Sequence, residues 1–244
     1  MSELLKVKNL KKGEIIREIG FELMKGEMTA IMGPSGSGKS TLLYNVSGMD
    51  RADEGEVWLG GQEIRTLSED EKADIRLHKM GFVFQQMNCL SNINLIDNIV
   101  FPAAHADRKR QSEYYARARE LMAKFHIEDL AERKINEVSG GQLQRACICR
   151  SMIMKPDIIF ADEPTGALNQ SSSAEVMDAF LKINSEGTAI LMVTHDSKVA
   201  SKCERVLYIL DGEIKGELSL GKYTPDNARE REQQVAAWLT GLGW

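Results

Sequence analysis

Gly33-Pro34-Ser35-Gly36-Ser37-Gly38-Lys39-Ser40 is the stretch that decides the fold, because it spaces three glycines ahead of a lysine and a hydroxyl residue. The preceding residues 28–32 form a short apolar run, which is typical of a buried strand, and the pattern of residues 40–46 predicts a helix. A strand, a glycine-rich loop and a helix in this order predict a phosphate-binding loop.

The chemistry of this loop suits a nucleoside triphosphate. Glycines let backbone N–H groups face a phosphate, the helix N-terminus favours its negative charge, and Lys39 adds a mobile point charge. A glycine-rich turn with a chance lysine would leave the flanking strand and helix unexplained. The predicted binding residues are Gly33, Pro34, Ser35, Gly36, Ser37, Gly38, Lys39, Ser40 and Thr41.

The composition limits the class of protein. The chain has 244 residues, a net charge of −5 and 27% charged residues. This length suits one sizeable core, and the missing basic excess argues against nucleic acid as a partner. No apolar run approaches the roughly 20 residues that span a bilayer, and the first residues lack a signal peptide, so we expect a cytoplasmic protein. The four cysteines follow no zinc-site spacing and are expected to be reduced.

Strand patterns on both sides of a helical stretch predict one α/β domain. Residues 15–23 and 56–59 indicate antiparallel strands, whereas 157–161 and 189–194, with a helix at 174–184 between them, indicate a parallel sheet. Residues 1–244 are expected to form a single domain, with a core and β subdomain at about 1–86 and 156–220 and a helical subdomain at about 87–155. A C-terminal helix is expected at about 226–241. Its apolar side is expected to consist of Val235, Ala236, Trp238 and Leu239.

Two neighbouring carboxylates, Asp162 and Glu163, follow the apolar run 158–161. The end of a buried strand can deliver Asp162 to Mg²⁺, which the Ser40 hydroxyl would also bind. Glu163, one residue further, can face the water that attacks a γ-phosphate. A mere surface charge at the strand end is the alternative for Glu163, and the neighbouring carboxylate disfavours it.

Ser139-Gly140-Gly141-Gln142 stands directly before a predicted helix at 143–154. A hydroxyl and free backbone N–H groups would therefore point at an anion. Together with the glycine-rich loop, the carboxylate pair and His195, this segment resembles the signature of ABC-type ATPases, over about residues 3–220. The resemblance implies a P-loop ATPase of α/β class with a mixed-sheet core, an N-terminal antiparallel β subdomain and an inserted helical subdomain, which hydrolyses ATP with Mg²⁺.

The same resemblance implies a homodimer and two further site residues. In this family two domains bind head to tail, and the signature of one closes on the γ-phosphate that the other holds. Gln85 is similar to the glutamine that contacts Mg²⁺ and the attacking water, and Gln86 is a weaker candidate. His195 is similar to the histidine that contacts the γ-phosphate and orients Glu163, although a lone histidine after an apolar strand is more often a packed core residue.

Two features depart from the family pattern. Asn169 stands in the D-loop where aspartate is usual, which removes a charge and predicts altered coupling between the two sites. Residues 8–14 contain no aromatic side chain, whereas family members commonly stack the adenine on one near the N-terminus. We therefore expect weaker binding of the base with phosphate binding retained.

The resemblance also implies an integral membrane permease, which holds the chain at the cytoplasmic face of the membrane. The expected docking segment is Met87 to Phe101, and its apolar residues could instead pack inside the helical subdomain. The apolar residues of this segment are Leu90, Ile93, Leu95, Ile96 and Ile99.

Within the family, the chain most resembles macrolide-exporter, lipoprotein-releasing and bacitracin-resistance ATPases, and residues 229–244 resemble members that export or resist antimicrobial peptides. This implies that ATP-driven dimer closure is coupled to export of, or resistance to, antimicrobial peptides or lipophilic substrates. The alternative is a soluble ABC ATPase that acts on a protein assembly or nucleic acid, as in cluster assembly or repair. Long coiled-coil or zinc insertions, usual in the repair class, are missing from this sequence.

Overall fold

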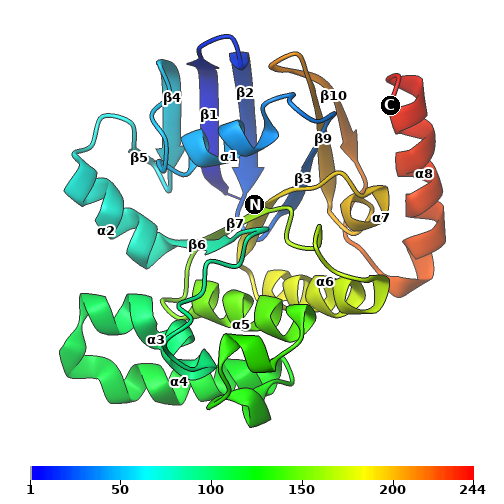
Figure 1. The fold of residues 1–244 in the computed structure, drawn as a ribbon. Helices are drawn as coiled ribbons and strands as arrows, with labels where there is room; N and C mark the ends of the chain where they lie inside the picture. The colour runs from blue at the N-terminus through cyan, green and yellow to red at the C-terminus, as the bar shows by residue number, and fades with distance from the viewer. Residues whose placement is uncertain (1) are drawn as a thin grey trace.

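Two β-sheets form the framework of the protein, of which the computed structural model describes residues 2–244 (Figure 1). The smaller sheet is antiparallel with the order β2-β1-β4-β5. The larger sheet has the order β10-β9-β3-β8-β7-β6, in which only the pair of β10 and β9 is antiparallel. The strands are β1 (Glu3–Lys12), β2 (Ile16–Met24), β3 (Met28–Met32), β4 (Glu54–Leu59), β5 (Gln62–Glu63), β6 (Met80–Val83), β7 (Ile158–Asp162), β8 (Ala189–Val193), β9 (Arg205–Leu210) and β10 (Glu213–Ser219). The predicted α/β class with a mixed sheet is confirmed.

The central strands β3, β7 and β8 are buried at every position. Parallel strands that are covered on both faces consist of continuous apolar residues rather than alternating ones. This is why the sequence pattern identified all three strands.

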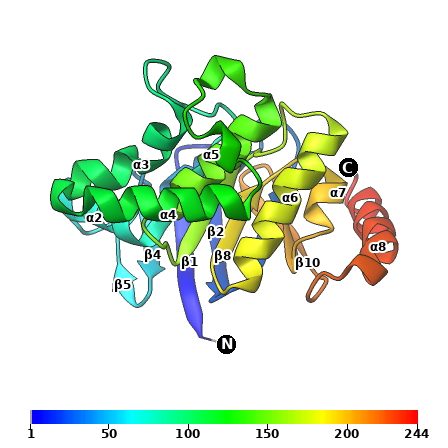
Figure 2. The ribbon, with the colours of Figure 1, turned by 90° about the horizontal axis from the view of Figure 1, so that it is seen from below.

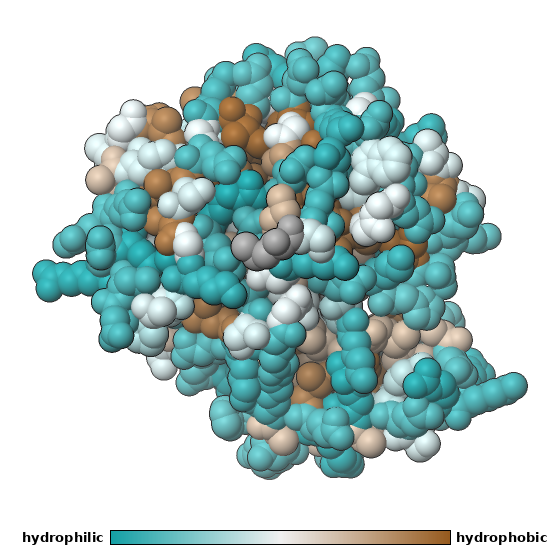
Figure 3. All heavy atoms as spheres, turned by 180° about the vertical axis from the view of Figure 1, so that it is seen from behind, coloured by the Kyte–Doolittle hydropathy of each residue, from teal (hydrophilic) through white to brown (hydrophobic). Residues whose placement is uncertain are grey.

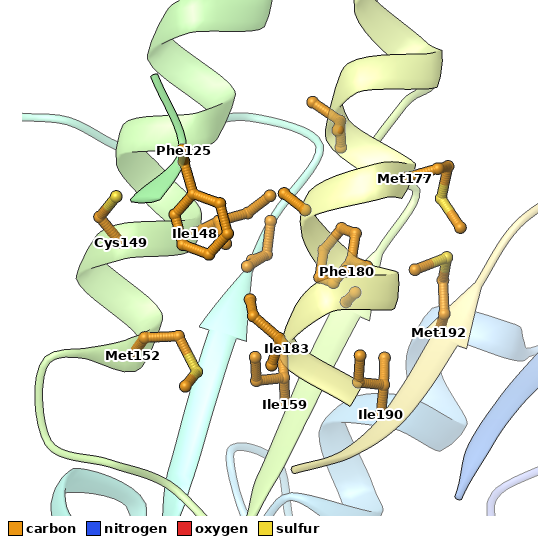
Figure 4. Close-up of a cluster of buried hydrophobic side chains, with 14 of the residues drawn as sticks. Phe125, Ile148, Cys149, Met152, Ile159, Met177, Phe180, Ile183, Ile190 and Met192 are labelled. Carbon is orange, nitrogen blue, oxygen red and sulfur yellow. The ribbon is translucent and has the colours of Figure 1, made fainter. Parts of the chain in front are cut away.

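Helices cover both faces of the larger sheet. They are α1 (Lys39–Val46), α2 (Glu69–Lys79), α3 (Leu95–Ala106), α4 (Gln111–Lys124), α5 (Gly140–Met152), α6 (Gln170–Ser185), α7 (Ser197–Ala200) and α8 (Ala228–Gly241). Viewed from below, α4, α5 and α6 lie across the strands, and α8 lies at the side near the C-terminus (Figure 2). Phe180 of α6 and Ile148 of α5 meet Ile159 and Ile190 of the sheet in one apolar cluster (Figure 4).

The C-terminal helix α8 packs one apolar side on the larger sheet. Val235 and Leu239 are buried, and the ring of Trp238 lies 6.3 Å from that of Tyr208. Ala236 is exposed, so its predicted place on the apolar side is wrong. Residues 235, 238 and 239 follow the helical spacing i, i+3, i+4, whereas residue 236 points about 100° away from residue 235.

We examine the helices and one face of the surface for features of a membrane-spanning protein. Among the helices of residues 2–244, none combines the length and apolarity that crossing a bilayer requires. The face behind the view of Figure 1 is mainly hydrophilic, with apolar residues in small, separate groups (Figure 3).

Candidate active site

The glycine-rich loop joins β3 to α1 and passes close to other backbone. A Cβ atom at Gly33 would lie 2.1 Å from the carbonyl oxygen of Ile209, and one at Gly38 would lie 2.9 Å from that of Ile15. Glycine avoids both contacts. Gly38 is the N-cap of α1 and provides no side-chain cap, so the first N–H groups of this helix are available to an anion.

Lys39 is the buried cation of the loop. Its Nζ donates to the carbonyl oxygen of Gly33 at 2.9 Å and to that of Pro34 at 2.8 Å. Burial lowers the pKa of Lys39, while the carboxylates of Glu163 and Asp162 oppose this shift. The loop thus holds a positive charge where the phosphates are predicted to bind.

Asp162, at the end of β7, faces the first turns of α1. Its Oδ1 accepts from Ser40 Oγ at 2.8 Å, and its Oδ2 accepts from the Tyr44 hydroxyl at 2.7 Å. Burial and then the hydrogen bond to Asp162 raise the pKa of Tyr44 to about 12. A hydroxyl and a carboxylate that meet in this way fit the oxygen ligands that Mg²⁺ prefers. Tyr44 was not predicted from the sequence, although its spacing of four residues from Ser40 puts both on one helix face.

Glu163 holds a strained backbone conformation beside His195. Its φ angle is 44°, and its N–H donates to the Val193 carbonyl oxygen at 3.0 Å. Nδ1 of His195 lies 3.2 Å from Glu163 Oε1. Non-glycine residues in the left-handed region cost energy and cluster at active sites. The pair therefore presents a carboxylate that can accept a proton, with an imidazole beside it.

Gln85 approaches Glu163 across Gly166. A Cβ atom at Gly166 would lie 3.1 Å from Gln85 Nε2 and 3.2 Å from Glu163 Oε2. Both side chains therefore flank this glycine. The contacts of Gln85 with Mg²⁺ and with the attacking water stay predictions.

A cavity of about 560 Å³ lies over the glycine-rich loop. This volume is within the range of pockets that bind small molecules. Two of its lining residues, Ile15 and Trp244, were not predicted from the sequence. The cavity is lined by Ile15, Gly33, Ser35, Gly36, Gly38, Lys39, Ser40, Thr41, Glu163, His195 and Trp244.

Trp244 reaches this cavity because α8 ends in a Schellman motif. The N–H of Gly243 donates to the Thr240 carbonyl oxygen, and the N–H of Trp244 donates to that of Leu239, both at 3.1 Å. This pair of hydrogen bonds defines the motif. The Trp244 ring packs edge-on against Tyr208 with 6.0 Å between ring centroids, yet 45% of Trp244 is exposed. The glycine after the predicted helix was the available signal for this turn.

The segment Ser139 to Gln142 forms the start of α5. Ser139 is the N-cap: its Oγ accepts from Gln142 N–H at 3.3 Å, and its own N–H donates to Gln142 Oε1 at 2.8 Å. A Cβ atom at Gly141 would lie 2.7 Å from the Ser172 side chain of α6. The lining of the cavity over the glycine-rich loop comes from other residues. The segment thus starts the helix without completing that cavity.

Asn169 is the N-cap of α6. Its Oδ1 accepts from the Ser172 N–H at 2.9 Å. Asparagine and aspartate cap helices about equally well. The departure from the family pattern therefore preserves the start of α6, and its effect on coupling stays a prediction.

A second cavity, of about 420 Å³, opens between the larger sheet and the helical subdomain. Leu90 and Phe101 line it and are 43% and 53% exposed. Leu95, Ile96 and Ile99 are instead buried in the core. Of the five apolar residues that were predicted for docking, Leu90 therefore lies at the surface, Ile93 is half-buried and the other three belong to the core.

Comparisons with known proteins match this architecture. The family model described as ABC transporter matches residues 16–166. The chain is 38% identical to the ABC transporter ATP-binding protein YxdL of Bacillus subtilis (strain 168), covering 100% of this chain and 96% of that protein. It is 39% identical to the lipoprotein-releasing system ATP-binding protein LolD of Aquifex aeolicus (strain VF5), over 90% of this chain and 99% of that one.

Longer proteins and a solved structure also match. The macrolide export ATP-binding/permease protein MacB of Pasteurella multocida (strain Pm70) is 39% identical over 93% of this chain, which spans 34% of the length of that protein. The dimeric, post-hydrolysis structure of the ATP-binding cassette MJ0796 with ADP and Pi matches with a TM-score of 0.79 and 35% identity. That match covers 90% of this chain and 100% of the other.

Proposed function

Because the chain belongs to the ABC transporter family, as an ATP-binding subunit that hydrolyses ATP, we propose that it drives a membrane permease by closing as a homodimer around ATP. The observation that carries the two-chain site is the separation of two segments. Ser139 to Gln142 do not line the cavity over the glycine-rich loop within the described residues 2–244. A second copy can supply this segment, and the dimeric form of the cassette MJ0796 supports that arrangement.

The hydrolysis step uses residues around the cavity. Glu163 accepts a proton from water as that water attacks the γ-phosphorus, and the bond to the β-γ bridging oxygen breaks to give ADP and phosphate. His195, 3.2 Å from Glu163, keeps the carboxylate oriented. Ser40 and Asp162 would hold Mg²⁺, which when bound neutralises charge on the β- and γ-phosphates. Lys39 turns from the loop carbonyls to the phosphates.

The cavity between the larger sheet and the helical subdomain is the proposed docking site of the permease. Leu90 and Phe101 are large apolar side chains left exposed at its edge. Burying such a surface against a partner is favourable. The name of MacB, which joins an ATP-binding and a permease part, supports a permease for this chain too. Docking of that kind would hold the chain at the cytoplasmic face of the membrane.

The docking proposal is tested by purifying the tagged chain from detergent-solubilised membranes of its host. We expect a multi-span membrane protein to co-purify with the wild-type chain and to be lost with Phe101→Asp. Ala237→Asp, on the exposed side of α8, is the matched control and should retain the partner. A chain that is fully active in its host and never brings a membrane protein with it contradicts the proposal.

For the substrate, we propose antimicrobial peptides or lipophilic compounds. The names of relatives support export from the membrane, since MacB is described as a macrolide exporter and LolD as part of a lipoprotein-releasing system. Host cells that carry Glu163→Gln should become several-fold more susceptible to membrane-active peptides. Unchanged susceptibility to every peptide tested, with the permease still co-purifying, would overturn this substrate class and leave the ATPase and its docking intact.

A further inference from the structure

Two thiols from separate elements meet beside the proposed docking cavity. Cys89 belongs to the segment between β6 and α3, and Cys147 lies on α5. Their Sγ atoms are 3.5 Å apart. The carbonyl oxygen of Met87 accepts from Cys89 Sγ at 3.5 Å and from Cys147 Sγ at 3.4 Å. The two sulfurs thus share one backbone oxygen and are in contact.

Arg150 fixes this arrangement. Its Nη2 donates to the Met87 carbonyl oxygen at 2.8 Å and its Nη1 to that of Asn88 at 2.9 Å. The same two nitrogens lie 3.7 Å from Cys89 Sγ and 3.8 Å from Cys147 Sγ. A guanidinium that cannot lose its proton therefore stands next to both sulfurs.

The two thiols differ in environment. Cys89 is half-buried, while Cys147 is buried. The hydrogen-bonding contact with Cys147, in which either thiol can donate, and the charge of Arg150 lower the pKa of Cys89, against the effect of its burial. The hydrogen bond with Cys89 and burial raise the pKa of Cys147. Because the thiolate is the reactive form, Cys89 is the thiol that reacts first.

We propose that Cys89 and Cys147 form a reversible disulfide when the protein meets a hydroperoxide. The Cys89 thiolate attacks a peroxide oxygen; the O–O bond breaks, an S–O bond forms, and the released hydroxide or alkoxide takes up a proton. Cys147 then attacks the sulfenic sulfur, the S–S bond forms, and the S–O bond breaks as hydroxide leaves and combines with the Cys147 proton as water. Two thiols are oxidised, and one peroxide is reduced. A dithiol reductant reverses the reaction by thiol exchange.

The two sulfurs are already close to bonding distance. An S–S bond is about 2.05 Å long, so the Sγ atoms, now 3.5 Å apart, must approach each other by about 1.5 Å. The bond would join α5 to the segment that carries Asn88 and Leu90, two residues of the docking cavity. Resting on the proposed function, oxidation therefore restricts the segment that receives the permease, and it gives the transporter a peroxide-sensitive state.

The test uses the full chain and hydrogen peroxide, followed by alkylation and peptide mass analysis without reductant. We expect a peptide pair joined through Cys89 and Cys147, with the loss of two hydrogen atoms, that dithiothreitol separates again. Hydrogen exchange should slow at the amides of residues 87–91 in the oxidised protein. Cys149, which packs near Phe125 (Figure 4), and Cys203 are buried internal controls and should stay reduced.

Single-cysteine variants distinguish the role of Cys89 in the reaction from that of Cys147. In Cys147→Ser, oxidised Cys89 has no thiol to attack it, so a cyclic-dione reagent should trap its sulfenic acid. Cys149→Ser is the matched control on the same helix and should form the disulfide as the wild type does. At pH 7 we expect Cys89 to be alkylated faster than Cys149 or Cys203, on the order of tenfold or more.

Two results would overturn the proposal. One is that Cys89 and Cys147 stay free under peroxide that oxidises exposed methionines; the other is that Cys89 couples only to other molecules. Thermal unfolding of each variant shows whether it is folded, and Cys147→Ala replaces Cys147→Ser if the serine unfolds the chain. The reaction needs neither ATP nor a permease, so its failure would leave the proposed function untouched.

Discussion

At the scale of single residues, Glu163 has an unfavourable backbone conformation at the position that is proposed to act as the catalytic base. A left-handed φ angle at a glutamate costs energy, and the bond from its N–H to Val193 holds it there. The same turn brings its carboxylate to His195 and into the cavity over the glycine-rich loop. The strain is therefore placed where the reaction is proposed to occur.

Glu163→Gln should lower the ATP hydrolysis rate by ~10² to 10⁴-fold, because glutamine cannot accept the proton of the attacking water. ATP binding should persist, since Lys39 and the loop are unchanged. Steady-state phosphate release and equilibrium titration with a fluorescent ATP analogue measure the two quantities. A variant that loses ATP binding together with turnover would assign Glu163 to binding instead.

Trp244 contributes an indole ring to the lining of the cavity over the glycine-rich loop. We expect ATP to quench its fluorescence and Trp244→Leu to weaken ATP binding about fivefold, corresponding to ~1 kcal/mol for one aromatic contact. Trp238→Leu is the matched control, because Trp238 also packs on Tyr208 but is not among the lining residues.

Tripolyphosphate, which has no base or ribose, distinguishes the kind of contact. If Trp244 contacts the base or ribose, Trp244→Leu binds tripolyphosphate as the wild type does. Equal ATP affinity of wild type and Trp244→Leu, with no change of fluorescence, would remove Trp244 from the site.

At the scale of elements, the starts of α5 and α6 lie against each other. Ser139 caps α5 and Asn169 caps α6, while Gly141 leaves room for Ser172. The glycine is therefore needed for helix packing, and the serine for the helix start. Gly141 and Ser139 therefore have structural roles that do not depend on a bound phosphate.

Ser139→Ala should destabilise the folded chain by ~1 kcal/mol, because α5 loses its N-cap. Ser139→Asn restores a capping side chain and should recover most of this loss. Urea unfolding, followed by circular dichroism, gives the free energy of unfolding of each variant. Equal stability of the alanine variant and the wild type would mean that the cap contributes little.

The sequence predicted the central elements and missed those that depend on short polar signals. β3, β7 and β8 were found because burial on both faces makes them continuous apolar runs. The helix α2 was missed because it is mostly charged, although Ser68 and Glu71 form a capping box at its start. The start of α6 was predicted four residues late because its serines, capped by Asn169, resemble a loop.

The candidate site shows the same division. Its ordered motifs could be found in the sequence because each one follows a strand or begins a helix. Tyr44 and Trp244 could not be found in this way, because neither belongs to a motif. Tyr44 reaches the site through its spacing along α1, and Trp244 reaches it through the turn that ends α8. Whether these two side chains lie at the site depends on which distant segments the fold brings together.

At the scale of the whole molecule, the two segments that are predicted to bind phosphate lie apart in one chain. The glycine-rich loop, Glu163 and His195 surround one cavity, whereas residues 139–142 start α5 elsewhere. Two copies in a head-to-tail arrangement would bring each segment to the other's nucleotide. We therefore propose that a working site consists of parts from two chains.

Mixing two inactive variants tests whether each site takes parts from two chains. Lys39→Ala lacks the cation of the loop, and Ser139→Asp keeps a capping side chain at α5 but places a negative charge where a phosphate should approach. Ser139→Asn, capped but uncharged, is the control for the charge. In the mixed dimer, the intact loop of one chain faces the intact signature of the other. We predict that each variant alone is nearly inactive and that the mixture hydrolyses ATP; a mixture no more active than the sum of its two components would contradict the account.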